Sequence, residues 1–307
     1  QDWCTVTVNG NVVTVAVPTY TGLVGRNAVV EISNTLDSKV RVPVSQAGGV
    51  WYVKGDDAYG LSDEESTITI PVKSDYDYTV DLPAWITGEK VKEGYNLTLA
   101  ENTTGNARKG TVTFTSERGA KKIVFLQFGI NDIAGTYEAT YSVYGDNDQL
   151  VEETKTFKLV QDVKNEELFY AEELSAIGGL VIPLKFDSET YQLSVFAGQY
   201  LGHIASKEWY LYTVVTSKAG YVHADAALAY SAIAEFDLDD EVVMPSFPFK
   251  DEKGFSFATS DGTIKSYLDG LEVYVFKSQS PSFSGGNALG YYDMFKNLSI
   301  KKVELKE

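Results

Sequence analysis

Apolar and polar residues alternate with a period of two along most of the chain, a pattern typical of β-strands that bury one face. The alternation is clear at residues 13–17 and again at 95–99. No window of about 20 uninterrupted apolar residues occurs, so the pattern predicts no membrane-spanning helix. We therefore expect an all-β fold.

The strand pattern of the first 49 residues recurs further along the chain. The offset between the two copies is 82 residues at first and 81 after a one-residue deletion. Two copies in one register predict two modules of the same fold. The matched positions are Trp3, Val13, Val15, Val17, Arg26, Val30, Ile32, Val42, Val44, Gln46 and Gly48 with Trp85, Tyr95, Leu97, Leu99, Arg108, Val112, Phe114, Ile123, Phe125, Gln127 and Gly129.

The two copies differ in length. The second occupies residues 50–130 and contains a full set of strands, whereas the first, residues 1–49, has nothing before Trp3 to match residues 67–82. The first copy therefore either lacks its opening strands or is truncated. We expect residues 50–130 to fold alone and the first copy not to, because half a sandwich leaves its apolar face uncovered.

The motif order in both copies resembles the BACON module, the "Bacteroidetes-associated carbohydrate-binding often N-terminal" family. The shared features are a Trp, an alternating strand, a Thr-Gly turn (residues 21–22 and 104–105), an Arg, and two strands that close on Gln-x-Gly. The resemblance covers the second copy in full and the later half of a module in the first. It implies immunoglobulin-like β-sandwiches and binding of carbohydrate or mucin.

The matched residues also have a purely structural interpretation. Trp3 and Trp85 recur among apolar neighbours, which favours core packing over ligand stacking. The matched arginines follow a turn, and we expect them to brace loop carbonyls or a carboxylate. Gln46 and Gln127 are expected to support the strand ladder or a turn at the module's end.

Residues 131–307 contain a different unit. Some eight strand candidates separated by turn signals predict a closed barrel or a sandwich, either of which limits exposed strand edges. Two segments, 165–168 and 226–236, are helix candidates from an N-cap pattern and an alanine-rich periodicity. The strand candidates are 136–143, 154–160, 179–186, 192–196, 209–215, 255–258, 272–276 and 298–305.

The opening of this unit, Ile133-Ala134-Gly135-Thr136-Tyr137, is similar to the Gly-x-aromatic start of lipocalin-like barrels. The resemblance implies a C-terminal β-barrel. Such a barrel either holds one small ligand or is filled by its own side chains.

Charge and cysteine content exclude several classes of function. The chain has 26 Lys and Arg against 43 Asp and Glu, a net charge of −17, which disfavours nucleic acid and anionic lipid as partners. Cys4 is the single cysteine in the sequence, so neither an intrachain disulfide nor a thiolate zinc site can form.

Candidates for catalysis and metal binding are few. The two histidines, His203 and His223, do not complete a metal site, and the acidic stretches 146–148 and 237–241 lack the EF-hand spacing. Glycoside hydrolysis needs a pair of carboxylates that the sequence does not single out. We expect no enzymatic activity, no metal and no cofactor.

Sugar binding requires aromatic faces beside planar polar groups, and the sequence supplies several such groups. Our candidate ligand-binding residues are Tyr291, Tyr292, Asp293, Trp209 and Tyr212; residues 51–59 offer similar material. A glycine-rich loop at 284–290 leads into the first three. Adjacent strand residues point to opposite faces, so we expect at most one tyrosine of this pair to pack inward, the other to be available to a ligand, and Asp293 to lie beside Tyr291. The alternative is that these rings fill cores and cross-strand pairs.

The sequence thus predicts a non-catalytic, monomeric accessory protein that binds glycan or mucin in the periplasm or at the bacterial cell surface. A lipid anchor outside this chain is compatible with that location. Two other functions remain open at this point: a carrier of a small apolar ligand in the C-terminal barrel, and a structural spacer.

Overall fold

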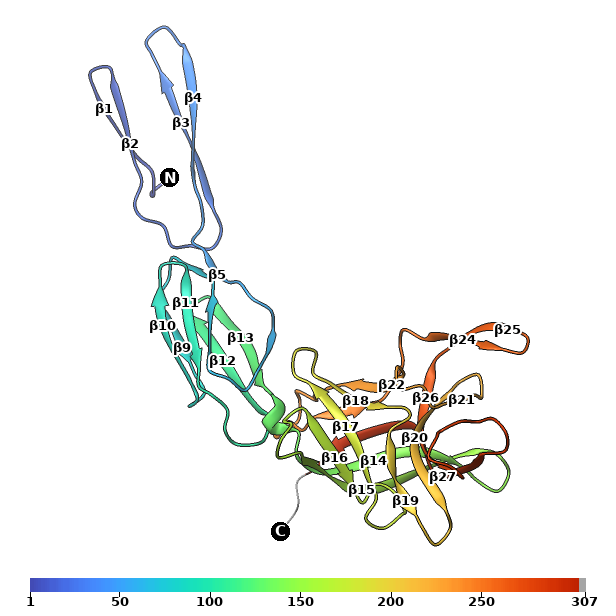
Figure 1. Cartoon of the computed structure of the whole chain (residues 1–307). Coiled ribbons are helices and arrows are strands. Elements are labelled where there is room, and N and C mark those ends of the chain that lie inside the picture. The colour runs from blue at the N-terminus through green and yellow to red at the C-terminus, as the bar shows by residue number, and fades with distance from the viewer. Residues whose placement is uncertain (304–307) are drawn as a thin grey trace. The chain divides into compact units, whose positions relative to one another are not determined.

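A computed structural model describes residues 1–303, and the fold is all-β as expected (Figure 1). Backbone contacts group the chain into two compact units. The first contains residues 1–59, 65–101 and 110–125, and the second contains 60–64, 102–109 and the chain from 126 onward. The division at residues 50 and 131 that we predicted from the repeat stays a prediction.

Both copies of the repeat form the same two hairpins at matched residues. In each copy the polar turns between the strands coincide with the turn signals of the sequence. In the first copy the strands are β1 (Thr5–Asn9), β2 (Val12–Ala16), β3 (Arg26–Ser33) and β4 (Lys39–Gln46), and in the second they are β10 (Ile86–Val91), β11 (Gly94–Leu99), β12 (Arg108–Ser116) and β13 (Gly119–Gln127).

The second copy has further strands that complete a sandwich. A three-stranded sheet has the order β10-β11-β7, and a four-stranded sheet has the order β6-β13-β12-β9. Leu97, Phe114 and Phe125 are fully buried, so alternate residues of both sheets form the core. The added strands are β5 (Trp51–Val53), β6 (Ala58–Leu61), β7 (Ser66–Ile70), β8 (Val72–Ser74) and β9 (Tyr78–Asp81).

The first copy exposes the positions that the second copy buries. Val15 is 36% exposed, whereas the matched Leu97 of the second copy is 0% exposed. Ile32 is 37% exposed, whereas the matched Phe114 is 0% exposed. In the second copy, β7 pairs with β11 and β9 pairs with β12, whereas β2 and β3 have no such partners within residues 1–303. The apolar face of the first copy is therefore open.

The matched arginine and glutamine form the same contact in both copies. Arg26 donates from Nε and Nη2 to Gln46 Oε1, at 3.0 and 2.9 Å. Arg108 makes the same two bonds to Gln127 Oε1, at 2.9 and 2.7 Å. In both copies the arginine thus binds a side-chain amide, a type of partner that we did not expect, because the hairpin register places Arg26 opposite Gln46. Trp85 is half-buried, not a fully buried core residue.

Replacing the amide should affect the two copies unequally. Gln127 is 0% exposed and Arg108 is half-buried, so Gln127→Ala removes two hydrogen bonds from a partly desolvated guanidinium, at a cost of about 1–2 kcal/mol in the free energy of unfolding. Gln46 is only half-buried, so water can replace the hydrogen bonds that Gln46→Ala removes. We therefore expect this variant to lower the free energy of unfolding by less than about 1 kcal/mol. Hydrogen exchange of the amides in β12–β13 and in β3–β4 measures both costs. Equal costs would contradict this account of the pair.

The second unit contains a curled sheet whose strands surround one interior (Figure 1). Its main path runs β19-β20-β26-β27-β14-β15-β16-β17-β18-β22, and its ends do not pair with each other in the described chain, so the sheet is a half-barrel. The lipocalin-like resemblance stays a prediction. The strands are β14 (Gly135–Tyr144), β15 (Leu150–Gln161), β16 (Leu168–Glu172), β17 (Val181–Asp187), β18 (Gln192–Phe196), β19 (Tyr200–Ile204), β20 (Trp209–Ser217), β21 (Val222–His223), β22 (Ala229–Ile233), β23 (Ser246–Pro248), β26 (Leu268–Phe276) and β27 (Ala288–Lys302), with β24 (Phe255–Thr259) and β25 (Gly262–Ser266) as a separate hairpin.

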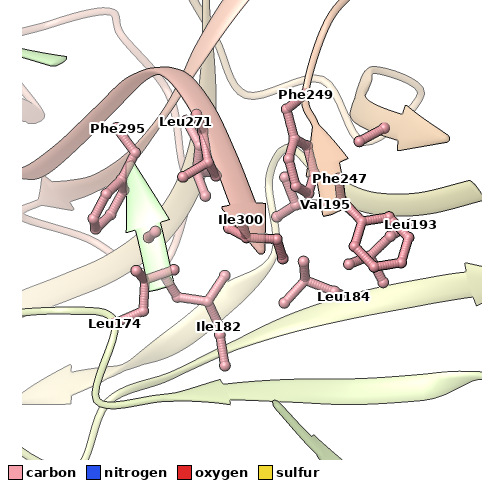
Figure 2. Close-up of a cluster of buried hydrophobic side chains, with 14 of the residues drawn as sticks. Leu174, Ile182, Leu184, Leu193, Val195, Phe247, Phe249, Leu271, Phe295 and Ile300 are labelled. Carbon is pink, nitrogen blue, oxygen red and sulfur yellow. The ribbon is translucent and has the colours of Figure 1, made fainter. Parts of the chain in front are cut away.

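Large apolar side chains from many strands fill the interior of this sheet. Figure 2 shows Ile182, Leu184 and Leu193 from neighbouring strands meeting Phe247 and Ile300 from the other side of the core. All five are 5% exposed or less. The interior is therefore a packed core, the second of the two outcomes that we considered for a barrel.

Neither helix candidate is helical. Residues 165–168 form a turn, in which Asn165 Oδ1 accepts the Glu167 N–H at 3.2 Å. Residues 226–236 contain strand β22, because Ala232 pairs with Leu193 of β18 and the sheet overrides the helix propensity of alanine. The expected strand at 298–305 begins earlier, at Ala288, and residues 304–305 lie outside the described range.

Candidate functional site

The curled sheet separates between β14 and β27. The two strands pair from Tyr137 opposite Lys302 to Ser142 opposite Lys296. Beyond Lys296, β27 pairs with β26 alone in the described chain. A cleft of about 220 Å³ lies at this separation. This volume is below the roughly 300–1,000 Å³ of sites that enclose a drug-sized ligand, so the cleft suits one small group of a larger ligand.

The cleft brings three of the predicted residues together with several that the sequence did not single out. Tyr291, Tyr292 and Asp293 line it from β27. The residues that sequence analysis missed are Tyr141, Val143 and Tyr144 from β14, Glu153 and Lys155 from β15, Leu174 and Ala176 from the loop after β16, and Met294 and Phe295 from β27.

A β-bulge changes how the predicted residues point. Tyr291 lies opposite Tyr274 and Asp293 lies opposite Val273, so Tyr292 is the extra residue of the bulge. Both tyrosines are exposed, at 52% and 43%, so neither of them packs inward. Asp293 and Tyr291 are on opposite faces, because Val273 belongs to the interior core and Tyr274 packs on the other side of the sheet.

Asp293 anchors the loop that follows β16. Its carboxylate accepts the hydroxyl of Ser175 and the backbone N–H of Ala176. Lys155 Nζ supports the same loop by donating to the carbonyls of Leu174 and Ser175, at 2.9 and 3.1 Å. Both charged groups are therefore engaged in holding one wall of the cleft.

Glu153 is the carboxylate of the cleft that faces solvent. It is exposed, and one of its oxygens accepts the Tyr141 hydroxyl at 3.4 Å. Burial raises the pKa of Tyr141, and the charges of Glu153 and Asp293 raise it further, so the phenol stays a donor at neutral pH. The cleft thus combines one exposed carboxylate with the phenol groups of exposed tyrosines.

The other two predicted residues lie outside the cleft lining. Trp209 is half-buried against the core. The centroids of the Trp209 and Tyr292 rings are 6.4 Å apart, and Lys207 Nζ lies 4.3 Å from the centroid of the Trp209 ring. Tyr212 is only 5% exposed, packed by Tyr200 and Phe276 with centroids 5.3 and 5.7 Å away. Tyr212 is therefore a packing residue and not a surface ring, which corrects the expectation of ligand contact.

Residues 1–303 show neither a metal-type cluster of side chains nor a membrane-crossing helix. In that range no three His, Cys, Asp or Glu side chains gather as they would around a metal ion. The same range includes no helix of the length and apolarity needed to cross a membrane.

Comparison with known proteins supports one part of the sequence interpretation. Residues 1–47 match the BACON family, which is described as "Putative binding domain, N-terminal". This match covers the first copy of the repeat. No curated protein and no solved structure matches the chain.

Proposed function

We propose that this chain is a non-catalytic glycan-binding protein and that the cleft between β14 and β27 holds part of the glycan. The family match at residues 1–47 is to a binding family and not to a catalytic one. That match supports binding in general, whereas the cleft supplies a location and a chemistry.

The observation that carries the proposal is the group of exposed rings around the cleft. Tyr144, Tyr291 and Tyr292 are 47%, 52% and 43% exposed, although aromatic rings of this size are usually more buried. Such rings stack on the C–H faces of a sugar, while a carboxylate accepts its hydroxyls. Glu153 supplies that carboxylate at the same cleft.

The state of the two carboxylates argues for binding without hydrolysis. A glycosidase needs two carboxyl groups free to act on opposite sides of one bond. Here Asp293 accepts hydrogen bonds from Ser175 and Ala176, which leaves Glu153 as the carboxylate available to a ligand in this cleft. The packed interior of the half-barrel likewise disfavours a carrier of apolar ligands.

We extend the proposal to location and assembly. The protein is a monomeric accessory protein of the periplasm or the bacterial cell surface, because a glycan-binding module of this family would meet its ligand there.

A glycan-array screen of the whole chain, followed by titration of the best ligand, tests the proposal. Tyr291→Ala and Tyr292→Ala should each weaken binding about three- to tenfold, the value of one aromatic contact. Tyr221→Ala is the matched control, because Tyr221 is 43% exposed in the same unit but lies between β20 and β21, outside the cleft lining. Absence of any glycan ligand, or equal affinities for all three variants, would refute the proposal.

A further inference from the structure

Strand register aligns four tyrosines across four neighbouring strands. Tyr200 of β19 lies opposite Tyr212 of β20, and Tyr212 lies opposite Tyr274 of β26. Tyr274 in turn lies opposite Tyr291 of β27, which lines the cleft. Directly opposed residues share a face of the sheet, so these four form a continuous row.

The row lies on the face of the sheet that points away from the core. Tyr212 and Tyr274 pack with Phe276 in a cluster separate from the interior. The residues that alternate with them on the same strands, such as Leu211 and Val273, belong to the interior core. The row is therefore a feature of the outer surface.

The ends of the row are the parts that a ligand can reach. Tyr200 and Tyr291 are 48% and 52% exposed, whereas Tyr274 is half-buried and Tyr212 is buried beneath its neighbours. Phe283, 41% exposed, covers the middle of the row with its ring centroid 5.4 Å from that of Tyr274. The two ends of the row are thus accessible, and Phe283 presents a third accessible ring against Tyr274 between them.

We propose that the glycan site continues from the cleft along this tyrosine row, and that its ligand is a linear, neutral oligosaccharide lying across the strands. This inference rests on the proposed function. Three strand spacings separate Tyr200 from Tyr291, about 14 Å, which is longer than a single sugar ring. One terminal sugar in the cleft cannot contact both ends of the row, whereas a chain of several units can.

The charges around the row favour a neutral ligand over an acidic one. The chain carries a net charge of −17, which repels sialylated or sulfated glycans. Lys155, the cation of the cleft, already donates to two backbone carbonyls. Phenol hydroxyls and the Glu153 carboxylate remain to bind uncharged hydroxyls.

A length series separates this inference from the function on which it rests. The probes are neutral linear glucans, mannans and galactans of one to six units, titrated against the whole chain. We expect affinity to rise to about four units. Tyr200→Ala should weaken binding of the longer chains about three- to tenfold and leave the disaccharide unchanged, because Tyr200 is at the far end of the row. Tyr291→Ala should weaken both.

Two further variants serve as controls, and the possible outcomes separate this inference from the proposed function. Tyr221→Ala should behave as wild type, because Tyr221 belongs neither to the cleft lining nor to the row. Tyr200→Thr keeps strand propensity at the edge strand β19 if the alanine variant melts early. Equal affinity for two and six units, no effect of Tyr200, or a preference for acidic glycans would overturn the inference while the proposed function stands. Failure of every glycan to bind would overturn both.

Discussion

Phe114→Ala is expected to lower the free energy of unfolding of the second repeat copy by about 3–5 kcal/mol. Phe114 is 0% exposed, and its ring contacts those of Tyr78 and Tyr95 with centroids 6.5 and 5.7 Å away. Its loss leaves a cavity between the two sheets. Hydrogen exchange of the amides in β10–β13 of the whole chain measures the change.

The matched position in the first copy supplies the control. Ile32 aligns with Phe114 but is 37% exposed, because no strand equivalent to β9 covers it in residues 1–303. Ile32→Ala should therefore cost less than about 1 kcal/mol, measured by exchange in β1–β4. A cost near that of Phe114→Ala would mean that the face of the first copy is covered in solution, and our account of it would be wrong.

This pair of positions indicates what strand alternation can predict. The period of two and the turn residues located β2 and β11 and the two strands after each matched arginine, because these signals depend on residues close in sequence. Burial depends on which strands pack against a hairpin. Val15 and Leu97 therefore have the same place in the pattern but different exposures, 36% and 0%.

The same distinction applies to the candidate site. Tyr291, Tyr292 and Asp293 could be found from the glycine-rich loop that precedes them, since loop composition is a local signal. Their orientation could not be predicted, because it depends on a bulge in the pairing of β27 with β26. Tyr144 and Glu153 were missed because β14 and β15 meet β27 only through long-range pairing.

The helix candidate at 226–236 failed for a related reason. Local propensity favours helix in an alanine-rich stretch, but β18 offers an edge on which residues 229–233 complete a ladder.

The matched residues Arg26 and Arg108, in contrast, do have the shared role that the sequence predicted. Their match in the repeat indicated a shared structural role, and both copies have the same guanidinium–amide pair, although the type of partner differed from our expectation.

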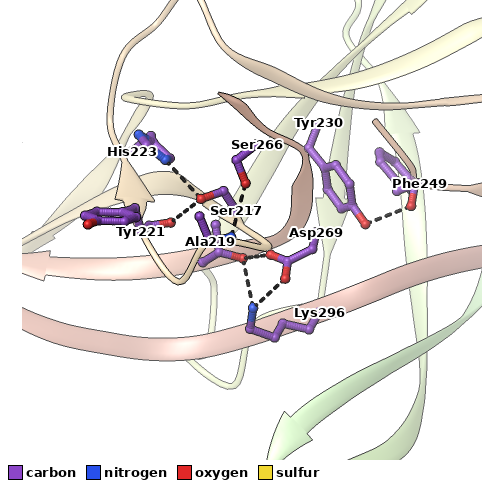
Figure 3. Close-up of polar contacts among 10 residues, drawn as sticks. Ser217, Ala219, Tyr221, His223, Tyr230, Phe249, Ser266, Asp269 and Lys296 are labelled. Carbon is purple, nitrogen blue, oxygen red and sulfur yellow. Dashed lines mark hydrogen bonds and ion pairs between the residues drawn. The ribbon is translucent and has the colours of Figure 1, made fainter. Parts of the chain in front are cut away.

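Glu272 is a buried carboxyl group without a full set of partners, on the same strand as Tyr274. It lies opposite Val214 and Met294, is 3% exposed, and its Oε2 accepts no hydrogen bond from the described residues. The nearby cation, Lys296, donates to Asp269 at 3.0 Å (Figure 3). Its Nζ also lies 3.5 Å from the Thr216 hydroxyl. Burial raises the pKa of Glu272 from 4.5 to about 7; Lys296 opposes this rise and Asp269 adds to it.

Glu272→Gln is therefore expected to stabilise the second unit at high pH and not at low pH. Below pH 4.5 the carboxyl is protonated in both the folded and the unfolded state, so it makes no difference between them. As pH rises from 4.5 to about 7, the carboxyl ionises in the unfolded chain but stays protonated in the folded one, so the stability of the wild type falls; above about 7 both states are ionised and the loss levels off. The pKa difference corresponds to about 3 kcal/mol in favour of the glutamine variant at pH 8.

Denaturant unfolding of the whole chain at pH 4.5 and pH 8, followed by hydrogen exchange in β20, β26 and β27, measures this difference. Glu138→Gln is the matched control, because Glu138 is an exposed glutamate on β14 of the same sheet and its replacement should change stability little at either pH. A Glu272→Gln effect that is the same at both pH values would contradict the prediction. The carboxyl would then titrate alike in the folded and unfolded chain, and its burial would not be the cause of any change in stability.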